Sequence, residues 1–185
     1  NKPLGLFCIN KGKVKVYKTN SEGKEQILRL AKDGDVIGYA SLMNGELYSS
    51  SASVLEDAMI CYVPKNVFLN LVQSNSNLSL RVIQLLSHDM NYAETRIANT
   101  AYNSVRERLA ETLLMLKEFS GYESDQTTLK TALSREDLAN MVGTATETVI
   151  RLLSEFNHEK MISIEGRKIK ILDYPSLMQA ANITD

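Results

Sequence analysis

The spacing of hydrophobic residues changes near residue 64, and this change predicts two kinds of structure along the chain. Before residue 64, segments 13–17 and 26–30 alternate apolar and polar side chains, and glycine-containing turns separate them. A further apolar segment, 59–63, closes the set. Alternation of this kind is typical of half-buried strands. Many short strands at this spacing predict a small antiparallel roll or barrel.

Helical periodicity begins at Pro64, a residue type that is favoured in the first turn of a helix. After a short helix that ends near Gln73, a long periodic stretch covers residues 78–100. A helix of about 23 residues spans about 35 Å, which exceeds the need of one small domain. Its apolar residues recur every three or four positions and form a narrow seam typical of paired helices: Val82, Leu86, Met90, Ala93 and Ile97. We therefore predict a homodimer interface, with packing of the seam against the chain's own barrel as the alternative.

Residues 133–156 predict a helix-turn-helix. Ser134 and Thr144 each precede an acidic residue by three positions, as N-capping residues do, and a glycine lies where the turn between the helices is expected. On the second helix, Glu147 and Arg151 fall on one side. The other side is apolar, with residues at helical spacing: Val149, Leu152, Leu153 and Phe156.

The polar face of this second helix has the side chains needed to read DNA. An arginine can form two hydrogen bonds with guanine in the major groove, and a carboxylate can accept one from cytosine N4. The alternative is an ordinary amphipathic helix pair in which Glu147 and Arg151 make only a surface contact.

The segment that follows favours the first interpretation. Residues 161–172 alternate on both sides of Glu165 and Gly166, which predicts a hairpin. Its tip and return strand carry basic residues placed for DNA phosphates: Arg167, Lys168 and Lys170. Helix, turn, helix and basic hairpin together predict a winged helix that binds double-stranded DNA.

Composition provides no general attraction to nucleic acid. Lys plus Arg is 21 against 22 for Asp plus Glu, and residues 134–185 hold six basic and eight acidic residues. DNA binding therefore depends on the local placement of charge. The sequence contains no nucleophile–base pair, carboxylate dyad or glycine-rich phosphate loop, so it does not predict an enzyme.

Both cysteines, Cys8 and Cys61, lie in apolar, strand-like segments, where cysteine usually acts as a small buried hydrophobe. Two cysteines cannot supply the four thiolates of a typical iron–sulfur cluster, and a disulfide between them is the less favoured alternative. The sequence has no signal peptide and no membrane-spanning apolar run. We therefore expect a cytoplasmic protein that has no membrane contact, and we expect no metal site.

The order of roll, long helix and winged helix resembles the Crp/Fnr family of bacterial transcription regulators. The most specific marks are Gly-Asp-Val-Ile-Gly at 34–38, Lys-Glu-Gln-Ile-Leu-Arg-Leu at 24–30 and Glu-Thr-Val-Ile-Arg at 147–151. The resemblance covers the whole chain and implies an α+β fold in three parts. These are an N-terminal antiparallel β-roll like a cyclic-nucleotide-binding domain (residues 1–74), a dimerisation helix and hinge (75–103), and a C-terminal winged helix-turn-helix (104–185).

The resemblance also implies a function and an incomplete start. A regulator of this family works as a homodimer that senses an effector in the roll. It binds a palindromic DNA site through paired recognition helices and contacts RNA polymerase. Family members have further strands before the position that matches residues 6–9, so we expect part of the roll to precede Asn1.

The resemblance assigns roles to residues of the second helix. Glu147 and Arg151 match the pair that reads a TGA-like half-site core, where Arg151 would bond guanine and Glu147 would accept from cytosine. Thr146 stands where cAMP-responsive members place another guanine-reading arginine, and Ile150 is placed to contact a thymine methyl. The predicted DNA-contacting set is completed by Ser134, Thr144, Arg167 and Lys168.

The family's phosphate-binding cassette matches residues 38–52, but the residues that bind a cyclic nucleotide are replaced. Tyr39 stands in place of the ribose-binding glutamate and Tyr48 in place of the phosphate-binding arginine. Ala93 and Glu94 replace the Thr-Ser pair that contacts adenine. Burial of a cyclic phosphate without its arginine is costly. We therefore expect an effector other than cAMP, in a pocket lined by Gly38, Tyr39, Ala40, Tyr48, Ser49 and Ser50.

The two histidines are the remaining candidates for cofactor binding. His88 on the long helix leaves haem sensing open, although a solvated or hydrogen-bonded residue is the favoured interpretation. His158, at the end of the second helix of the helix-turn-helix, is expected to complement the negative end of the helix dipole. The sequence does not identify the effector. The alternative function is a ligand-binding or protein-interaction module whose winged helix does not bind DNA, which the acidic balance of residues 134–185 favours.

Overall fold

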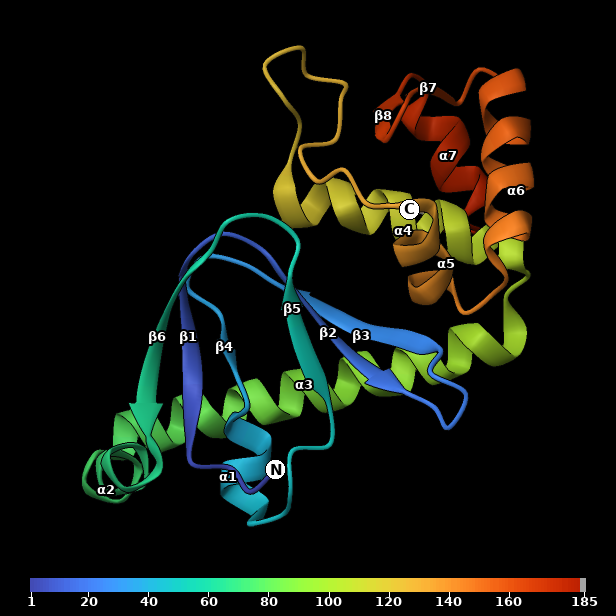
Figure 1. The fold of residues 1–185 in the computed structure, drawn as a ribbon. Helices are drawn as coiled ribbons and strands as arrows, with labels where there is room; N and C mark the ends of the chain where they lie inside the picture. Colours follow the sequence, from blue (N-terminus) through green and yellow to red (C-terminus); the bar gives the residue numbers. More distant parts are fainter. Residues whose placement is uncertain (184–185) are drawn as a thin grey trace. The chain divides into compact units, whose positions relative to one another are not determined.

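The computed structural model describes residues 1–183 and divides them into two compact units, one formed by Asn1–Ile97 and one that begins at Ala98 (Figure 1). The first unit holds six strands and short helices, and the second holds four helices and a hairpin. The predicted α+β fold is confirmed. The boundary between the units falls inside helix α3 (Ser76–Tyr102), which contributes to both.

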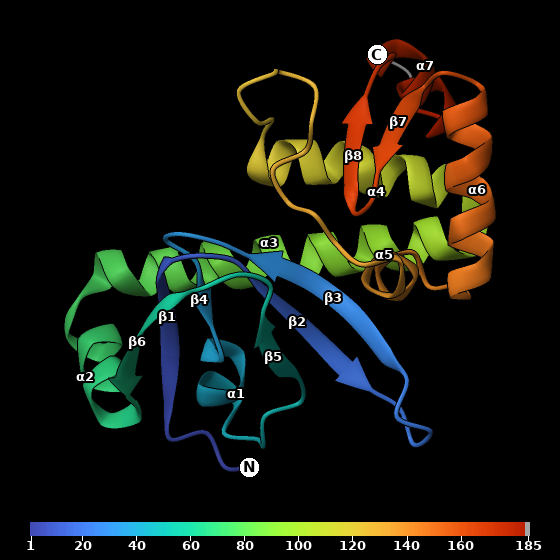
Figure 2. The ribbon, with the colours of Figure 1, turned by 45° about the horizontal axis from the view of Figure 1, so that its top comes forward.

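The first unit contains two antiparallel sheets of three strands each, as the alternating segments predicted. One sheet has the order β4 (Val36–Ile37), β1 (Gly5–Lys11) and β6 (Met59–Pro64). The other has the order β3 (Glu25–Ala31), β2 (Val14–Thr19) and β5 (Ser51–Val54), and Figure 2 shows β2 and β3 as a long hairpin. Apolar residues from both sheets are buried together: Ile9, Val14, Val16, Ala31 and Ile37.

Cys8 and Cys61 lie directly opposite each other on β1 and β6, and both are free thiols. Burial and the neighbouring Cys61 raise the pKa of the Cys8 thiol. Cys61 is exposed. The expectation of two buried cysteines is therefore wrong for Cys61, which lies on the surface of the described part of its unit.

Two further helices follow the sheets, α2 (Lys65–Ser74) and α3, and α3 has two apolar faces. Val82 is only 7% exposed and packs in a core with Leu6, Tyr39, Leu42 and Phe68, and Leu86 packs partly against the same core. The predicted dimer seam is therefore wrong at Val82, because the chain's own roll buries this residue. A second face leaves three side chains exposed at intervals of seven residues, Ile83 (58%), Met90 (59%) and Ile97 (71%), which we call the α3 row.

The second unit packs four helices and a hairpin around one core. Its elements are α4 (Val105–Ser120), α5 (Arg135–Val142), α6 (Thr146–His158), β7 (Ile162–Glu165), β8 (Lys168–Ile171) and α7 (Tyr174–Ala180). The sequence patterns predicted all of these except α7. Asp173 is the N-cap of helix α7: its side chain accepts a hydrogen bond from the Ser176 backbone amide, and a proline lies in the first turn of the helix.

Candidate nucleic-acid interface

The turn between α5 and α6 has the local chemistry of a helix-turn-helix. Ser134 caps α5, because its hydroxyl accepts a hydrogen bond from the Asp137 amide at 2.9 Å. Helix α5 ends at Gly143, whose φ of 76° is left-handed and favours glycine. Helix α6 begins one residue later than predicted, with Ala145 as its N-cap and no capping side chain. The prediction of Thr144 as an N-cap is therefore wrong.

Helix α6 is divided into a buried and an exposed face, as its periodicity predicted. The buried face consists of Val149, Leu152, Leu153 and Phe156, all at most 4% exposed. Glu147, Ile150 and Arg151 are exposed, and the Arg151 side chain is 64% exposed. Figure 2 shows α6 in the same unit as the β7–β8 hairpin and α4. The first turns of α6 thus present a carboxylate, an apolar side chain and a guanidinium to solvent.

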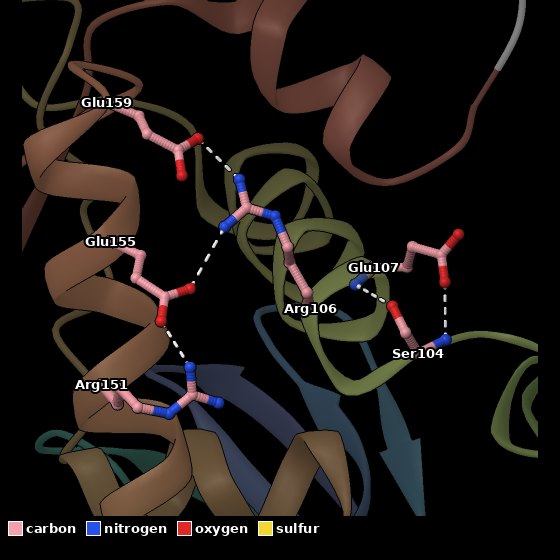
Figure 3. A network of polar contacts seen from close by, with 6 residues as sticks. All are labelled: Ser104, Arg106, Glu107, Arg151, Glu155 and Glu159. Atoms are coloured by element: carbon pink, nitrogen blue, oxygen red, sulfur yellow. Dashed lines mark hydrogen bonds and ion pairs between the residues drawn. The ribbon is translucent and has the colours of Figure 1, made fainter.

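A polar network joins α6 to α4 (Figure 3). Arg151 donates to the Glu155 carboxylate one turn further along α6, and Arg106 of α4 lies 3.4 Å from the same carboxylate. Arg106 also donates to Glu159 at 2.6 Å, and its guanidinium lies 4.6 Å from the centroid of the Phe156 ring. The sequence reasoning missed Arg106 and Glu155, because residues 49 positions apart carry no joint signal in one sequence.

The start of α4 is fixed next to this network. The Ser104 hydroxyl accepts from the Glu107 amide, and the Glu107 carboxylate accepts from the Ser104 amide, which forms a capping box (Figure 3). These hydrogen bonds hold the pKa of the Glu107 carboxyl below its usual range. The capping box therefore fixes the first turn of α4, which carries Arg106.

The β7–β8 hairpin presents its basic residues beside acidic ones. Glu165 pairs with Lys168 across the strands, and Gly166 and Arg167 form the exposed tip. The Lys168 ammonium lies 2.8 Å from Glu123, and the Lys170 ammonium lies 2.9 Å from Glu165. The lysines predicted to contact phosphates thus form ion pairs near the surface, and such pairs contribute little free energy.

The N-terminus of α5 is tied to this hairpin. Arg135 Nη2 donates to the Gly166 carbonyl at 2.8 Å, which links the first residue of α5 to the hairpin tip. Partial burial lowers the pKa of the Arg135 guanidinium from its ordinary value. Arg135 was not among the predicted site residues, and its role here is to hold the hairpin tip beside the helix-turn-helix.

Two tyrosines of residues 38–52, the segment expected to hold the effector, are bonded to other parts of the first unit. Tyr39 is 3% exposed, and its hydroxyl donates to Asp89 of α3. Burial and the Asp89 carboxylate raise the Tyr39 pKa well above its usual range. The Tyr48 hydroxyl donates to the Gly5 carbonyl, and its ring lies next to Gly38, which begins helix α1 (Tyr39–Asn44) with a left-handed φ of 86°.

These contacts place the predicted effector residues in different environments. Ala40 and Ser49 are exposed, whereas Gly38 and Ser50 are half-buried. The hydroxyls of both tyrosines, Tyr39 and Tyr48, are hydrogen-bonded to other parts of the unit. Residues 38–52 contain no lysine or arginine that could pair with a phosphate.

The histidines lie where the sequence placed them. The His88 side chain is 78% exposed, and its Nδ1 is 3.8 Å from an Asp89 oxygen. His158 is in the last turn of α6. Within residues 1–183, no three His, Cys, Asp or Glu side chains are grouped so that they could hold a metal ion. The same residues include no helix that is long and apolar enough to cross a membrane.

Comparison with known proteins matches both units. Residues 1–75 match the cyclic nucleotide-binding domain model and residues 107–180 match the Crp-like helix-turn-helix domain model. The chain is 28% identical over 180 residues to the fumarate and nitrate reduction regulatory protein of Vibrio cholerae, covering 97% of this chain and 72% of that protein. It is 29% identical over 173 residues to electron transport regulator A of Shewanella oneidensis, covering 93% of this chain and 69% of that protein. The chain thus spans about 70% of the length of these relatives.

Solved structures share the arrangement of elements. A transcriptional regulator of the CRP/FNR family from Thermus thermophilus is 25% identical, with a TM-score of 0.82 over 98% of this chain and 92% of that chain. A mutant of CooA from Carboxydothermus hydrogenoformans is 26% identical, with a TM-score of 0.77 over 96% of this chain and 78% of that chain. Both units of the chain, in the same order, therefore have counterparts in solved regulators.

Proposed function

This chain belongs to the Crp/Fnr family of bacterial transcription regulators, and we propose that it acts as a homodimer on a palindromic DNA site under the control of an effector other than cAMP. Proteins of this family regulate transcription and are not enzymes. The observation that carries the proposal is the two-faced character of α6. Four apolar residues anchor one face, and Glu147 and Arg151 stand on the other, near the start of the helix.

The exposed face of α6 suits a TGA-like half-site. Arg151 would bond guanine O6 and N7, and Glu147, one turn earlier, would accept from a cytosine N4 amino group. Ile150, 51% exposed, would contact a thymine methyl, and Thr146 lies in the first turn of the helix. Supporting phosphate contacts would come from Ser134, Thr144, Arg167 and Lys168.

The α3 row supports the proposed homodimer. Its three side chains repeat every seven residues, and Leu86 and Ala93 fall between them at the alternating spacing of three and four that a coiled coil uses. Leu86 is half-buried and Ala93 is exposed. A second copy of the chain, related by a two-fold axis, would cover this row and supply a second α6 for the other half-site of a palindrome.

The cassette supports an effector other than cAMP, because Tyr39 and Tyr48 are hydrogen-bonded within the unit and bring no positive charge. For a regulator of this kind we propose a cytoplasmic location and RNA polymerase as a further partner. Relatives are named as a regulator of fumarate and nitrate reduction, an anaerobic regulatory protein and an electron transport regulator, and we propose a related signal for this chain.

A titration of fluorescent random-sequence duplex DNA at several salt concentrations tests whether the winged helix binds DNA. A DNA-binding regulator loses affinity steeply and linearly in the logarithm of salt concentration as counterions are released. The alternative, a winged helix that contacts protein, has no phosphate contacts and should show no binding at any salt concentration. Absence of binding at low salt would overturn the proposal.

A further inference from the structure

Glu155 lies between two arginines that have different surroundings (Figure 3). One of its carboxylate oxygens accepts from Arg151 Nη1, and the other lies 3.4 Å from Arg106 Nη1. Glu155 and Arg106 are about two-thirds buried, whereas the Arg151 side chain is mainly exposed. The carboxylate thus connects a fixed arginine on α4 with a solvent-facing arginine on α6.

Arg106 is the fixed end of this connection. Its second Nη donates to Glu159 at 2.6 Å, and its guanidinium lies over the Phe156 ring, which is fully buried in the core. A guanidinium held by an ion pair, a ring and a second carboxylate has few alternative rotamers. Arg106 therefore holds the Glu155 carboxylate at one position relative to α6.

The contact with Glu155 leaves Arg151 with N–H donors that can bind a base. A guanidinium has five N–H donors in a planar fork, so one bond to a carboxylate leaves donors for two acceptors on a base edge. A long side chain that is already held in one orientation loses less conformational freedom when it binds. Orientation also matters because a bidentate contact tolerates little displacement.

We propose that Glu155, held by Arg106, is a positioning residue that sets the guanine specificity of the protein by orienting the Arg151 guanidinium. This inference rests on the proposed reading of guanine by Arg151. It assigns sequence discrimination to a side chain that does not itself touch a base. The Glu155 carboxylate also repels nearby DNA phosphates. The inference therefore predicts that Glu155 raises specificity for guanine and lowers the affinity for DNA of any sequence.

The matched control is Glu159, one turn further along the chain. It carries the same charge and pairs with Arg106, whereas Arg151 pairs with Glu155. Glu159→Gln and Glu155→Gln therefore remove the same charge from the same region. Only Glu155→Gln removes the carboxylate that orients Arg151.

The experiment uses the full chain and two duplexes: the site recovered from a randomised pool, and the same site with its half-site guanines replaced. Fluorescence anisotropy gives the ratio of the two affinities, and random-sequence DNA gives the general affinity. Glu155→Gln should lower the ratio by about three- to tenfold, since part of the ordering of an arginine is lost, and should raise the affinity for random DNA. Glu159→Gln should raise the affinity for random DNA but lower the ratio much less than Glu155→Gln, because Arg106 keeps its contacts with Glu155 and the Phe156 ring.

Glu155→Asp provides a second variant that keeps the charge and shortens the side chain. It should lower the ratio without raising the affinity for random DNA. A ratio equal to that of wild type in Glu155→Gln and Glu155→Asp, or an equal loss in Glu159→Gln, would overturn the inference. Arg151→Ala separates the two proposals: if it keeps the full ratio, guanine reading by Arg151 fails, and if only it lowers the ratio, the positioning role of Glu155 fails.

Discussion

A carboxylate placed in the α3 row should separate the proposed dimer. Ile83, Met90 and Ile97 are 58 to 71% exposed, and full burial of such a side chain contributes about 1.5–3 kcal/mol. Covering the exposed part of each is then worth about 1–2 kcal/mol, or about 6–12 kcal/mol for the six side chains of a symmetric pair. Part of this offsets the loss of translational and rotational freedom, which costs about 4–15 kcal/mol. The free energy from burial of the α3 row is therefore only about as large as the cost of association.

In a symmetric dimer, Met90→Glu weakens the interface in two ways. It removes two apolar side chains and places two carboxylates near the two-fold axis, where neither has a partner. The dissociation constant should rise by at least about a hundredfold, since each 1.4 kcal/mol is a factor of ten. Sedimentation equilibrium of the full chain over a range of concentrations measures this directly, and Ala93→Glu should behave in the same way.

Thr95→Glu is the matched control for this experiment. Thr95 is an exposed residue of α3 two positions before Ile97, which places it about 160° around the helix from the α3 row. It introduces the same charge on the same helix and should leave the dimer intact. The reasoning is refuted if Met90→Glu and Thr95→Glu have the dissociation constant of the wild type, or if both raise it equally.

Three further predictions concern the effector segment, the hairpin and the second unit. Calorimetric titration with cAMP should show no stoichiometric micromolar binding, because residues 38–52 hold no lysine or arginine for the phosphate and the hydroxyls of Tyr39 and Tyr48 are bonded within the unit; a micromolar isotherm would contradict this. Lys168→Ala should weaken binding to all DNA sequences alike and reduce the salt slope by about one, and an unchanged slope would remove Lys168 from the phosphate-contacting set. Hydrogen bonds from the Thr128 hydroxyl, the Thr128 amide and the Thr127 amide hold the pKa of Asp125 well below its ordinary value. A depressed folded-state pKa contributes stability that is present above the unfolded pKa of about 3.9 and is lost as pH falls below it. The melting temperature of Asp125→Asn should therefore fall less between about pH 6 and pH 2.5 than that of wild type, and an equal fall would contradict the assignment.

Helix α6 could be predicted because its sequence contains one apolar stripe and that stripe has one partner, the core of its own unit. Val149, Leu152, Leu153 and Phe156 are all buried as their spacing predicted. Helix α3 could not be resolved in the same way, because it has two apolar faces. Spacing alone does not show that Val82 faces the roll while Ile83, the next residue, faces solvent. Burial by the chain's own roll is a tertiary property.

Interactions between distant segments also could not be predicted from the sequence. The Ser134 cap was predicted because the cap and its partner are three residues apart, whereas Arg106 and Glu155 are separated by 49 positions. The Thr144 prediction was wrong by one residue, since the pattern of a capping residue followed by an acid does not fix where α6 begins. The tyrosine replacements in the cassette were visible in the sequence, but their hydrogen bonds to Asp89 and Gly5 were not.

Randomised-site selection with the wild-type chain and with Arg151→Ala tests the central claim, that α6 reads DNA through its exposed face. The wild type should recover a palindrome whose two TGA-like half-sites lie about one turn of DNA apart. Arg151→Ala should recover the same palindrome with the information at the half-site guanine largely lost, in keeping with about 1–3 kcal/mol of discrimination from one bidentate arginine. Recovery of no palindrome by the wild type, or of an undiminished guanine by Arg151→Ala, would contradict the account.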